Sequence, residues 1–540
     1  MKKILIYLFV LASIFTACED DLNVTPIDPN LVFGDEVYSS LDGYQQVLAK
    51  IYSSYNVAGQ KGDNNESDLS TISDGGMSAY LRNYWNMQTL PTGEAMNAWN
   101  DNGLVPLQNA NWSADNQYVA GMFYRLYYMI ALTNEFLSKS ASGSVVEQNQ
   151  EAIAGMRAEA RLIRAIAYYH GIDLYGKLSI IDENSTEQYP TPVDRKTLFN
   201  WIISQLEDEI IPDLPAAGTA EYGHMDAGTA YMVLAKMYIN AVNFSGVENP
   251  VDGKVSYDEV IKYTELVNAA YTLDSNYRKL FSIDNDECTG IIFALAVDAS
   301  RTRGFSASQY VMSAGTNGAL GNFVGIPSST WGGNHATRSI YDKFQARPAG
   351  DSRGKTQSID ETLDYRTMLV INAGLDMANP LDYTQGLNVT KFKNKSSDGT
   401  TSGSDPYFVD TDYPMFRLAD SYLMYAEAVL RGGNGSMSTA LGYVNEVIAR
   451  AYDGSHANDI SQSQLTLDFL LEERGREFYW EGYRRQDLIR FGKFTTNTYL
   501  WPWKGGTQNG RAIDAYRVVY PIPSAELASN PNASQNDDNY

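Results

Sequence analysis

Apolar residues recur at helical spacing along much of the chain. In the longest of these runs, Ile153, Met156 and Ala160 mark one face of an amphipathic helix. The same periodicity predicts helices over about 35–55, 116–139, 148–175, 195–211, 225–243, 255–271, 417–431, 436–451 and 464–481. Several of these helices come as neighbouring pairs with short connections. We therefore predict a mainly α protein with a helical-repeat scaffold of the tetratricopeptide kind.

Two long irregular blocks interrupt the helical pattern, at residues 59–114 and 281–412. The first is rich in Gly, Asn, Asp and Ser, and the second adds short strand-like runs such as residues 290–297. Long irregular regions inside a compact protein are usually functional or disordered, and tryptophans such as Trp99 favour an ordered region. Because helices occupy both ends of the chain, we predict one domain over residues 18–540, with both blocks inserted in it.

The first residues predict export and lipid attachment. Two lysines precede an apolar run over residues 4–15, as in a signal peptide, and that run is too short to span a bilayer comfortably. The residues Phe-Thr-Ala-Cys that end at Cys18 are similar to a bacterial lipobox, although its first residue is usually Leu. We predict removal of residues 1–17 and a lipid anchor on Cys18. The alternative is simple cleavage after Ala17 with a free thiol.

Charge and composition narrow the classes of partner. The 540-residue chain has a net charge of −24, which argues against nucleic acid and against electrostatic docking to anionic lipid. It has 38 Tyr and 8 Trp but only 4 His, so it is rich in stacking surfaces and poor in proton shuttles. The second cysteine, Cys288, has no partner for a disulfide when Cys18 carries lipid, and it is predicted to be a buried thiol.

Sequence signatures of enzymes are mostly absent. The chain has no HExxH helix, CxxC pair or GxSxG elbow, and residues 350–356 only imitate a phosphate loop, with three residues between the glycines instead of four. The histidines show no ligand spacing and are predicted to be structural: His170, His224, His335 and His456. We predict that the protein is not an enzyme. A glycoside hydrolase remains an alternative, because the separation of its two carboxylates is spatial.

Two acidic clusters could hold a hard cation. One is residues 284–287, which include Asp286, and the other contains Asp410 and Asp412. Calcium binds six to eight oxygens from carboxylates, amides and carbonyls, and exported proteins meet it at high concentration. Neither cluster is an EF-hand loop. A structural Ca²⁺ at these three aspartates is one hypothesis and two solvated acidic turns are the other, and no cofactor is predicted to be required.

Residues 472–494 combine acids, bases and aromatics in a short span. Acids and bases stand at i,i+3 spacing, as in Glu473–Arg476 and Arg474–Glu477. Taken alone, this stretch predicts a helical hairpin with buried ion pairs. Its amino-acid sequence also resembles the C-terminal signature motif of the SusD/RagB family, which consists of outer-membrane glycan-binding lipoproteins of Bacteroidetes.

Other sequence motifs resemble those of this family and follow one another in the same order as in the family. They lie at residues 156–176, 416–428, 445–451 and 521–536, so that the resemblance covers nearly the whole mature chain. It implies a SusD-like fold and a location on the outer surface of the outer membrane. It also implies glycan binding without chemistry, and a TonB-dependent SusC-like channel as the partner that takes up the glycan.

The resemblance is closest to starch-binding members of the family, and it implies a starch or maltooligosaccharide ligand. Another polysaccharide is the alternative, since Phe305 stands where a tyrosine is expected and Asn97 where a second tryptophan is expected. The residues implied to contact the glycan are Asp74, Arg82, Trp99, Asn102, Phe305 and Trp331. The aromatic rings can cover the apolar face of a sugar, while the carboxylate, amide and guanidinium groups can pair with its hydroxyls.

Overall fold

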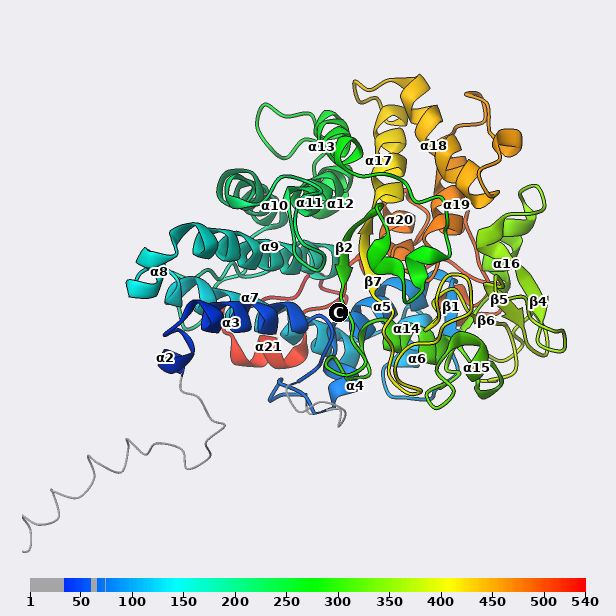
Figure 1. The fold of residues 1–540 in the computed structure, drawn as a ribbon, viewed down its shortest axis with the longest axis horizontal. Coiled ribbons are helices and arrows are strands. Elements are labelled where there is room, and N and C mark those ends of the chain that lie inside the picture. The colour runs from blue at the N-terminus through cyan, green and yellow to red at the C-terminus, as the bar shows by residue number, and fades with distance from the viewer. Residues whose placement is uncertain (1–33, 60–65, 73) are drawn as a thin grey trace, which may run out of the picture.

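The computed structural model describes residues 34–59, 66–72 and 74–540. The predicted signal peptide and the lipid site at Cys18 lie outside these ranges. Figure 1 shows the long helices following one another in an arc, while the strands β1 and β4–β6 and the helices α14–α16 gather on one side of it. The mainly α prediction is confirmed.

The helices of the arc match the predicted periodic segments closely. Ile153, Met156 and Ala160 are buried on one face of α9, as their spacing predicts. Consecutive helices pack pairwise, α7 on α9, α11 on α13 and α17 on α18. The bounds are α3 Leu41–Ser53, α7 Gln117–Lys139, α9 Gln150–Tyr175, α10 Arg195–Ser204, α11 Ala227–Ile239, α13 Ser256–Ala270, α17 Leu418–Leu430, α18 Met437–Ala451 and α19 Leu467–Glu477.

The two blocks predicted to be irregular contain more regular structure than their sequences indicate. In the first block, α5 spans Tyr80–Thr89 and buries Asn83, Asn86 and Gln88 along with its apolar residues. Because α5 has only 10 residues, half of them polar, and lies in a block rich in Gly and Asn, the sequence analysis did not predict it. The other helices of the blocks are α4 Gly75–Ser78, α6 Leu104–Gln108, α14 Ala307–Gly315, α15 Gly321–Val324 and α16 Arg338–Gln345.

Short strands join the two blocks to each other. A five-stranded sheet has the order β1-β3-β6-β5-β4, and in it β1 pairs antiparallel with β3, Ala95 opposite Ala336 and Asn97 opposite Asn334. A second, two-stranded sheet pairs β2 with β7, so that the strand predicted within residues 290–297 is confirmed. The bounds are β1 Ala95–Asn97, β2 Ile291–Leu295, β3 Asn334–Ala336, β4 Thr356–Ser358, β5 Leu369–Ile371, β6 Leu387–Val389 and β7 Tyr413–Arg417.

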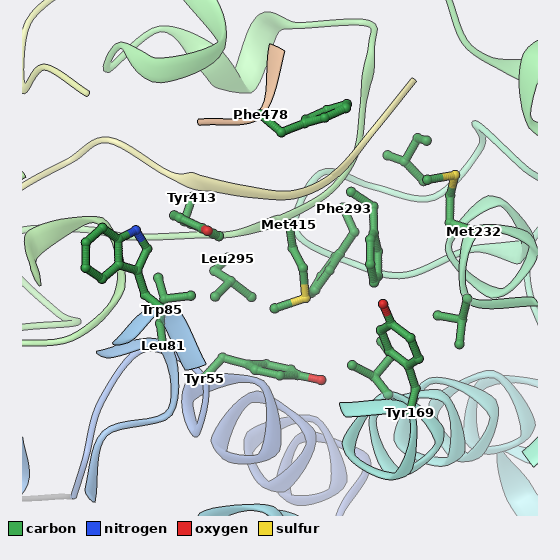
Figure 2. Close-up of a cluster of buried hydrophobic side chains, with 14 of the residues drawn as sticks. Tyr55, Leu81, Trp85, Tyr169, Met232, Phe293, Leu295, Tyr413, Met415 and Phe478 are labelled. Carbon is green, nitrogen blue, oxygen red and sulfur yellow. The ribbon is translucent and has the colours of Figure 1, made fainter. Parts of the chain in front are cut away.

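One cluster of buried apolar side chains connects the helical arc to both blocks. Figure 2 shows Tyr55 after α3 and Tyr169 on α9 near Phe293 of β2 and Met415 of β7, with Trp85 of α5 in the same cluster. Residues from the first block, the second block and the arc therefore share the same core. Burial of this kind of apolar surface is the main favourable contribution to folding.

The stretch 472–494 forms α19 and α20 (Arg484–Arg490), and its charges are buried in ion pairs as predicted. Glu473 pairs with Arg476 at 2.8 Å, as their spacing indicates. The predicted pair Arg474–Glu477 is wrong, because both side chains turn toward partners on other elements. Arg474 pairs with Asp420 and Asp487, while Glu477 pairs with Arg353, Arg417 and Arg450.

Candidate functional site

A hollow of about 390 Å³ lies where the first and second blocks meet. We call it the aromatic hollow, and its lining residues are Arg82, Trp99, Asp101, Phe305, Trp331 and Tyr407. Arg82, Trp99, Phe305 and Trp331 belong to the set implied by the family resemblance. They come from segments more than 200 residues apart, which the fold brings together.

The pairing of β1 with β3 places the two tryptophans. Trp99 follows the end of β1, Trp331 precedes the start of β3, and Ala98 N–H donates to the Gly333 carbonyl at 2.7 Å. The Trp99 ring lies directly against Gly333, where a Cβ atom would be only 2.1 Å from the ring. Only glycine therefore lets the Trp99 ring approach the backbone this closely.

The four aromatic rings follow one another along the hollow, each at an angle to the next. The ring centroids of Trp99 and Trp331 are 6.4 Å apart with planes at 46°. Phe305 meets Trp331 at 5.6 Å and 73°, and it meets Tyr407 at 6.2 Å and 62°. The rings therefore form a curved surface of apolar faces rather than a flat one.

Arg82 supplies a polar group at the edge of this surface. Its guanidinium carbon lies 5.5 Å from the centre of the Trp99 ring and 5.0 Å from that of Tyr310, within cation–π range. Burial works against its charge, but Tyr310, Tyr118 and Asp74 outweigh this and raise the pKa of Arg82. Its Nε is buried and lacks a hydrogen-bond partner within the described residues, while the side chain as a whole lines the hollow.

Two residues of the implied set do not line the aromatic hollow. Asp74 accepts a hydrogen bond from Met77 N–H at 3.1 Å at the start of α4, and it lines a separate hollow of about 410 Å³. Asn102 is exposed next to Asp101. A role for Asp74 and Asn102 in glycan contact stays a prediction, and here Asp74 acts on the aromatic hollow through the charge of Arg82.

Asn97, which stands where a second tryptophan is expected, supports the site through its hydrogen bonds. It is fully buried in β1, where its Nδ2 donates to Asn334 Oδ1 at 2.6 Å and its Oδ1 accepts from Trp99 N–H at 2.8 Å. Its side chain therefore supports the backbone of Trp99 and lies away from the hollow.

Asp101 and Tyr407 line the hollow and were not found from the sequence. Tyr407 adds a phenol oxygen next to Phe305, the residue that stands where a tyrosine is expected. The only signal for Tyr407 was its place just before Asp410 and Asp412, and Asp101 had no signal of its own.

Asp410 connects the two loops that carry Phe305 and Tyr407. Its Oδ1 accepts a hydrogen bond from Ala299 N–H at 2.9 Å, and its Oδ2 accepts one from Ser404 N–H at 2.5 Å. One carboxylate thus joins the segment before Phe305 to the segment before Tyr407. Hydrogen bonds to a carboxylate are among the stronger ones in proteins.

The three predicted calcium ligands are close enough for the charges of Asp286 and Asp410 to affect Asp412. Asp412 is buried and accepts hydrogen bonds from Val297 N–H and from the Tyr222 hydroxyl. Burial raises the pKa of Asp412 to about 6, and the charges of Asp286 and Asp410 add to this effect. Across residues 34–59, 66–72 and 74–540, no group of three or more acidic, His or Cys side chains has an arrangement that could hold a metal ion. Calcium remains a hypothesis.

The histidines and Cys288 lie elsewhere. His170 is buried beside the Tyr80 hydroxyl, and the ring of His335 lies between the carbonyls of Gln385 and Gly332, at 2.5 and 2.7 Å. Cys288 is a free, buried thiol. None of them lines the aromatic hollow.

Comparison with known proteins identifies the family. A family model for the SusD family matches residues 369–540. Over 568 residues the chain is 32% identical to the starch-binding protein SusD of Bacteroides thetaiotaomicron, covering 98% of this chain and 97% of that one. The chain belongs to the SusD family. It is also 24% identical to SusD-like protein P25 of Formosa agariphila, over 99% of this chain and 98% of that one.

Solved structures show the fold of the SusD family in the same arrangement. Surface glycan-binding protein A of Bacteroides thetaiotaomicron, in complex with laminarihexaose, matches with a TM-score of 0.66 at 18% identity, over 93% of this chain and all of that one. A laminarin-binding SusD-like protein matches with a TM-score of 0.65 at 19% identity, over 92% and 99%. In the part of the chain that the structure describes, no helix is long and apolar enough to cross a membrane.

Proposed function

We propose that the protein is a non-catalytic glycan-binding protein and that the aromatic hollow holds starch or a maltooligosaccharide. The observation that carries this proposal is the curved row of rings formed by Trp99, Trp331, Phe305 and Tyr407, with Arg82 and Asp101 at its edge. A sugar ring has an apolar C–H face for the aromatic surface and a rim of hydroxyls for the charged groups.

The angles between the rings support a curved glycan. Neighbouring planes meet at 46°, 73° and 62°, which fits a coiled α-glucan better than a flat chain such as cellulose. The relative at 32% identity is named a starch-binding protein, which supports the same ligand. Another polysaccharide is the second candidate, because two structural neighbours are described with laminarihexaose or laminarin.

The cellular setting is part of the proposal. A lipid on Cys18 would anchor the protein to the outer surface of the outer membrane, since acyl chains contribute about 0.8 kcal/mol per buried methylene. The partner would be a SusC-like TonB-dependent transporter, which takes over the bound oligosaccharide. The net charge of −24 suits a protein that must not adhere to anionic surfaces.

Affinity electrophoresis in gels that contain single polysaccharides tests the ligand. We expect retardation by amylopectin and none by cellulose derivatives. Retardation by laminarin alone would replace the α-glucan with the second candidate, and no retardation in any gel would refute glycan binding. Incubation of the pure protein with starch should release no reducing ends.

A further inference from the structure

A second and larger hollow lies at the other end of the β1–β3 pair. It has a volume of about 860 Å³, and we call it the charged hollow. Glu94 lines it just before β1, and Thr337 N–H, just after β3, donates to the Glu94 carbonyl at 3.1 Å. Helices α16 and α19, which pack against each other, form its walls. The short β1–β3 pair therefore has Trp99 at one end and Glu94 at the other.

Three charged side chains within the hollow, Lys343, Glu472 and Arg484, are already paired with one another. Lys343 Nζ lies 2.5 Å from Glu472 Oε2 and donates to the Tyr499 hydroxyl at 3.0 Å. Arg484 donates to the same hydroxyl at 2.7 Å, and that hydroxyl donates to Glu472 Oε1 at 2.5 Å. Burial opposes the charge of Glu472, but Arg484 and Lys343 lower its pKa to about 2. A ligand that brought its own charge would have to break this network.

Glu94 has hydrogen-bonding capacity that the protein does not use. Glu94 is only 2% exposed. In the described part of the chain, the one hydrogen-bond donor to its carboxyl group is Trp480 N–H, at a long 3.3 Å. Burial raises the pKa of Glu94 to about 7, although Arg484 lies near enough to oppose the shift. A buried carboxyl group with one long hydrogen bond is costly unless a ligand completes its bonding.

We propose that the charged hollow is a second binding site, for a neutral, polyhydroxylated ligand: a further segment of the glycan held in the aromatic hollow. Hydroxyl groups can donate to Glu94 and accept from Lys343 or Arg484 without disturbing the charge balance. The proposal rests on the proposed function. Two sites on one long chain make the second contact intramolecular, so that they raise the affinity for polymers more than for short oligosaccharides.

A blocking substitution tests the site without touching its network. Ala346 is exposed at the C-terminal end of α16 and lines the hollow, while the adjacent Gln345 is exposed and does not line it. In calorimetry with maltoheptaose we expect two sites in the wild type, one in Ala346→Trp and two in the control Gln345→Trp. In amylopectin gels, Ala346→Trp should bind at least about tenfold more weakly than the control.

The outcomes separate this proposal from the proposed function. If Trp99→Ala removes all binding and Ala346→Trp changes neither the site number nor the gel affinity, the second site is refuted while glycan binding stands. If no variant binds any glycan, both are refuted. Reducing ends released by the wild type but not by Glu94→Gln would also overturn the proposal, because two carboxyl groups of unlike pKa could then act as acid and base.

Discussion

At the scale of single residues, the aromatic hollow depends on Trp99 more than on any other side chain. Trp99 contacts Trp331, Tyr310, Arg82 and the backbone of Gly333. We predict that Trp99→Ala weakens glycan binding at the aromatic hollow at least tenfold, which is about 1.4 kcal/mol, because it removes the ring and lets Arg82 move. Calorimetry with maltoheptaose measures the effect.

Tyr189→Ala is the matched control for this substitution. Tyr189 is an exposed aromatic residue that does not line the hollow, and its removal should leave the affinity unchanged. Thermal unfolding of both variants separates binding from stability. If Trp99→Ala unfolds far below the wild type, the ring is needed for the fold, and the loss of binding says nothing about contact with sugar.

The burial of His170 should make the stability of the protein depend on pH. It is only 1% exposed, and burial, helped by the charge of Lys236, lowers its pKa to about 3, whereas the unfolded chain has about 6.5. Below pH 6.5 the unfolded state therefore binds a proton that the folded state excludes. This contribution to stability is complete above pH 6.5 and is lost at about 1.4 kcal/mol per pH unit as the pH falls toward 3.

The variant His170→Gln should lose this dependence. We expect its free energy of unfolding to fall less steeply between pH 6.5 and 4.5 than that of the wild type, as measured with urea at each pH. His456→Gln serves as the control, because His456 is largely exposed beside Asp459. Equal slopes in wild type and His170→Gln would show that His170 is not the group that titrates.

Calcium binding by three aspartates is a further prediction about single residues. Burial is the main cause of the raised pKa of Asp412, and a cation between Asp286, Asp410 and Asp412 would relieve the repulsion that adds to it. We expect the melting temperature in millimolar Ca²⁺ to exceed that in a chelator, and this difference to vanish in Asp412→Asn. The same melting temperature with and without Ca²⁺ would refute a calcium site at these three aspartates.

At the scale of elements, Asp410 controls how the loops of the second block meet. It holds Ala299 and Ser404 at once, upstream of Phe305 and Tyr407. We predict that Asp410→Ala weakens glycan binding roughly three- to tenfold, because each lost hydrogen bond to a carboxylate is worth about 1.5–3 kcal/mol of loop stability. Asp398→Ala is the control, since Asp398 serves only its own turn with Ser396 and Thr400. Equal affinities in the two variants would remove Asp410 from this role.

The elements that the sequence predicted are mainly long helices with apolar residues at helical spacing. In α9, Ile153, Met156 and Ala160 repeat on one face, and the bounds of the helix follow from this periodicity. Helix α5 was not predicted because it is short and half polar, and the β1–β3 pair was not predicted because three paired residues leave no sequence pattern. In α19, the spacing of Arg474 and Glu477 would allow them to pair with each other. Instead they pair with residues of other elements, such as Asp420 and Arg417, and only the fold reveals these partners.

The candidate site was predictable only in part, for a related reason. Arg82, Trp99, Phe305 and Trp331 were found through resemblance to a family, which carries spatial information that a single sequence lacks. Tyr407 reaches the hollow because Asp410 and its neighbours bring two loops together. No spacing rule relates residues 305 and 407, so the contact could not be inferred from the chain alone.

At the scale of the whole molecule, a buried ion network holds the arc and the second block together. Glu477 of α19 is fully buried and pairs with Arg353, Arg417 and Arg450, at 3.1, 2.8 and 2.5 Å. These arginines lie near β4, at the end of β7 and on α18. The network therefore ties distant parts of the chain to the shared apolar core. A single domain over residues 18–540 stays a prediction.

Removal of one member tests this cooperativity. Glu477→Gln leaves three buried arginines short of a charge, and we expect a loss of about 3–5 kcal/mol in the free energy of unfolding. Tryptophan fluorescence and far-UV circular dichroism should still report one coincident denaturant transition, at a lower midpoint. Glu446→Gln, an exposed change on α18, should shift the midpoint little. Two separate transitions in Glu477→Gln would mean that the arc and the second block unfold independently, so that the chain comprises more than one folding unit.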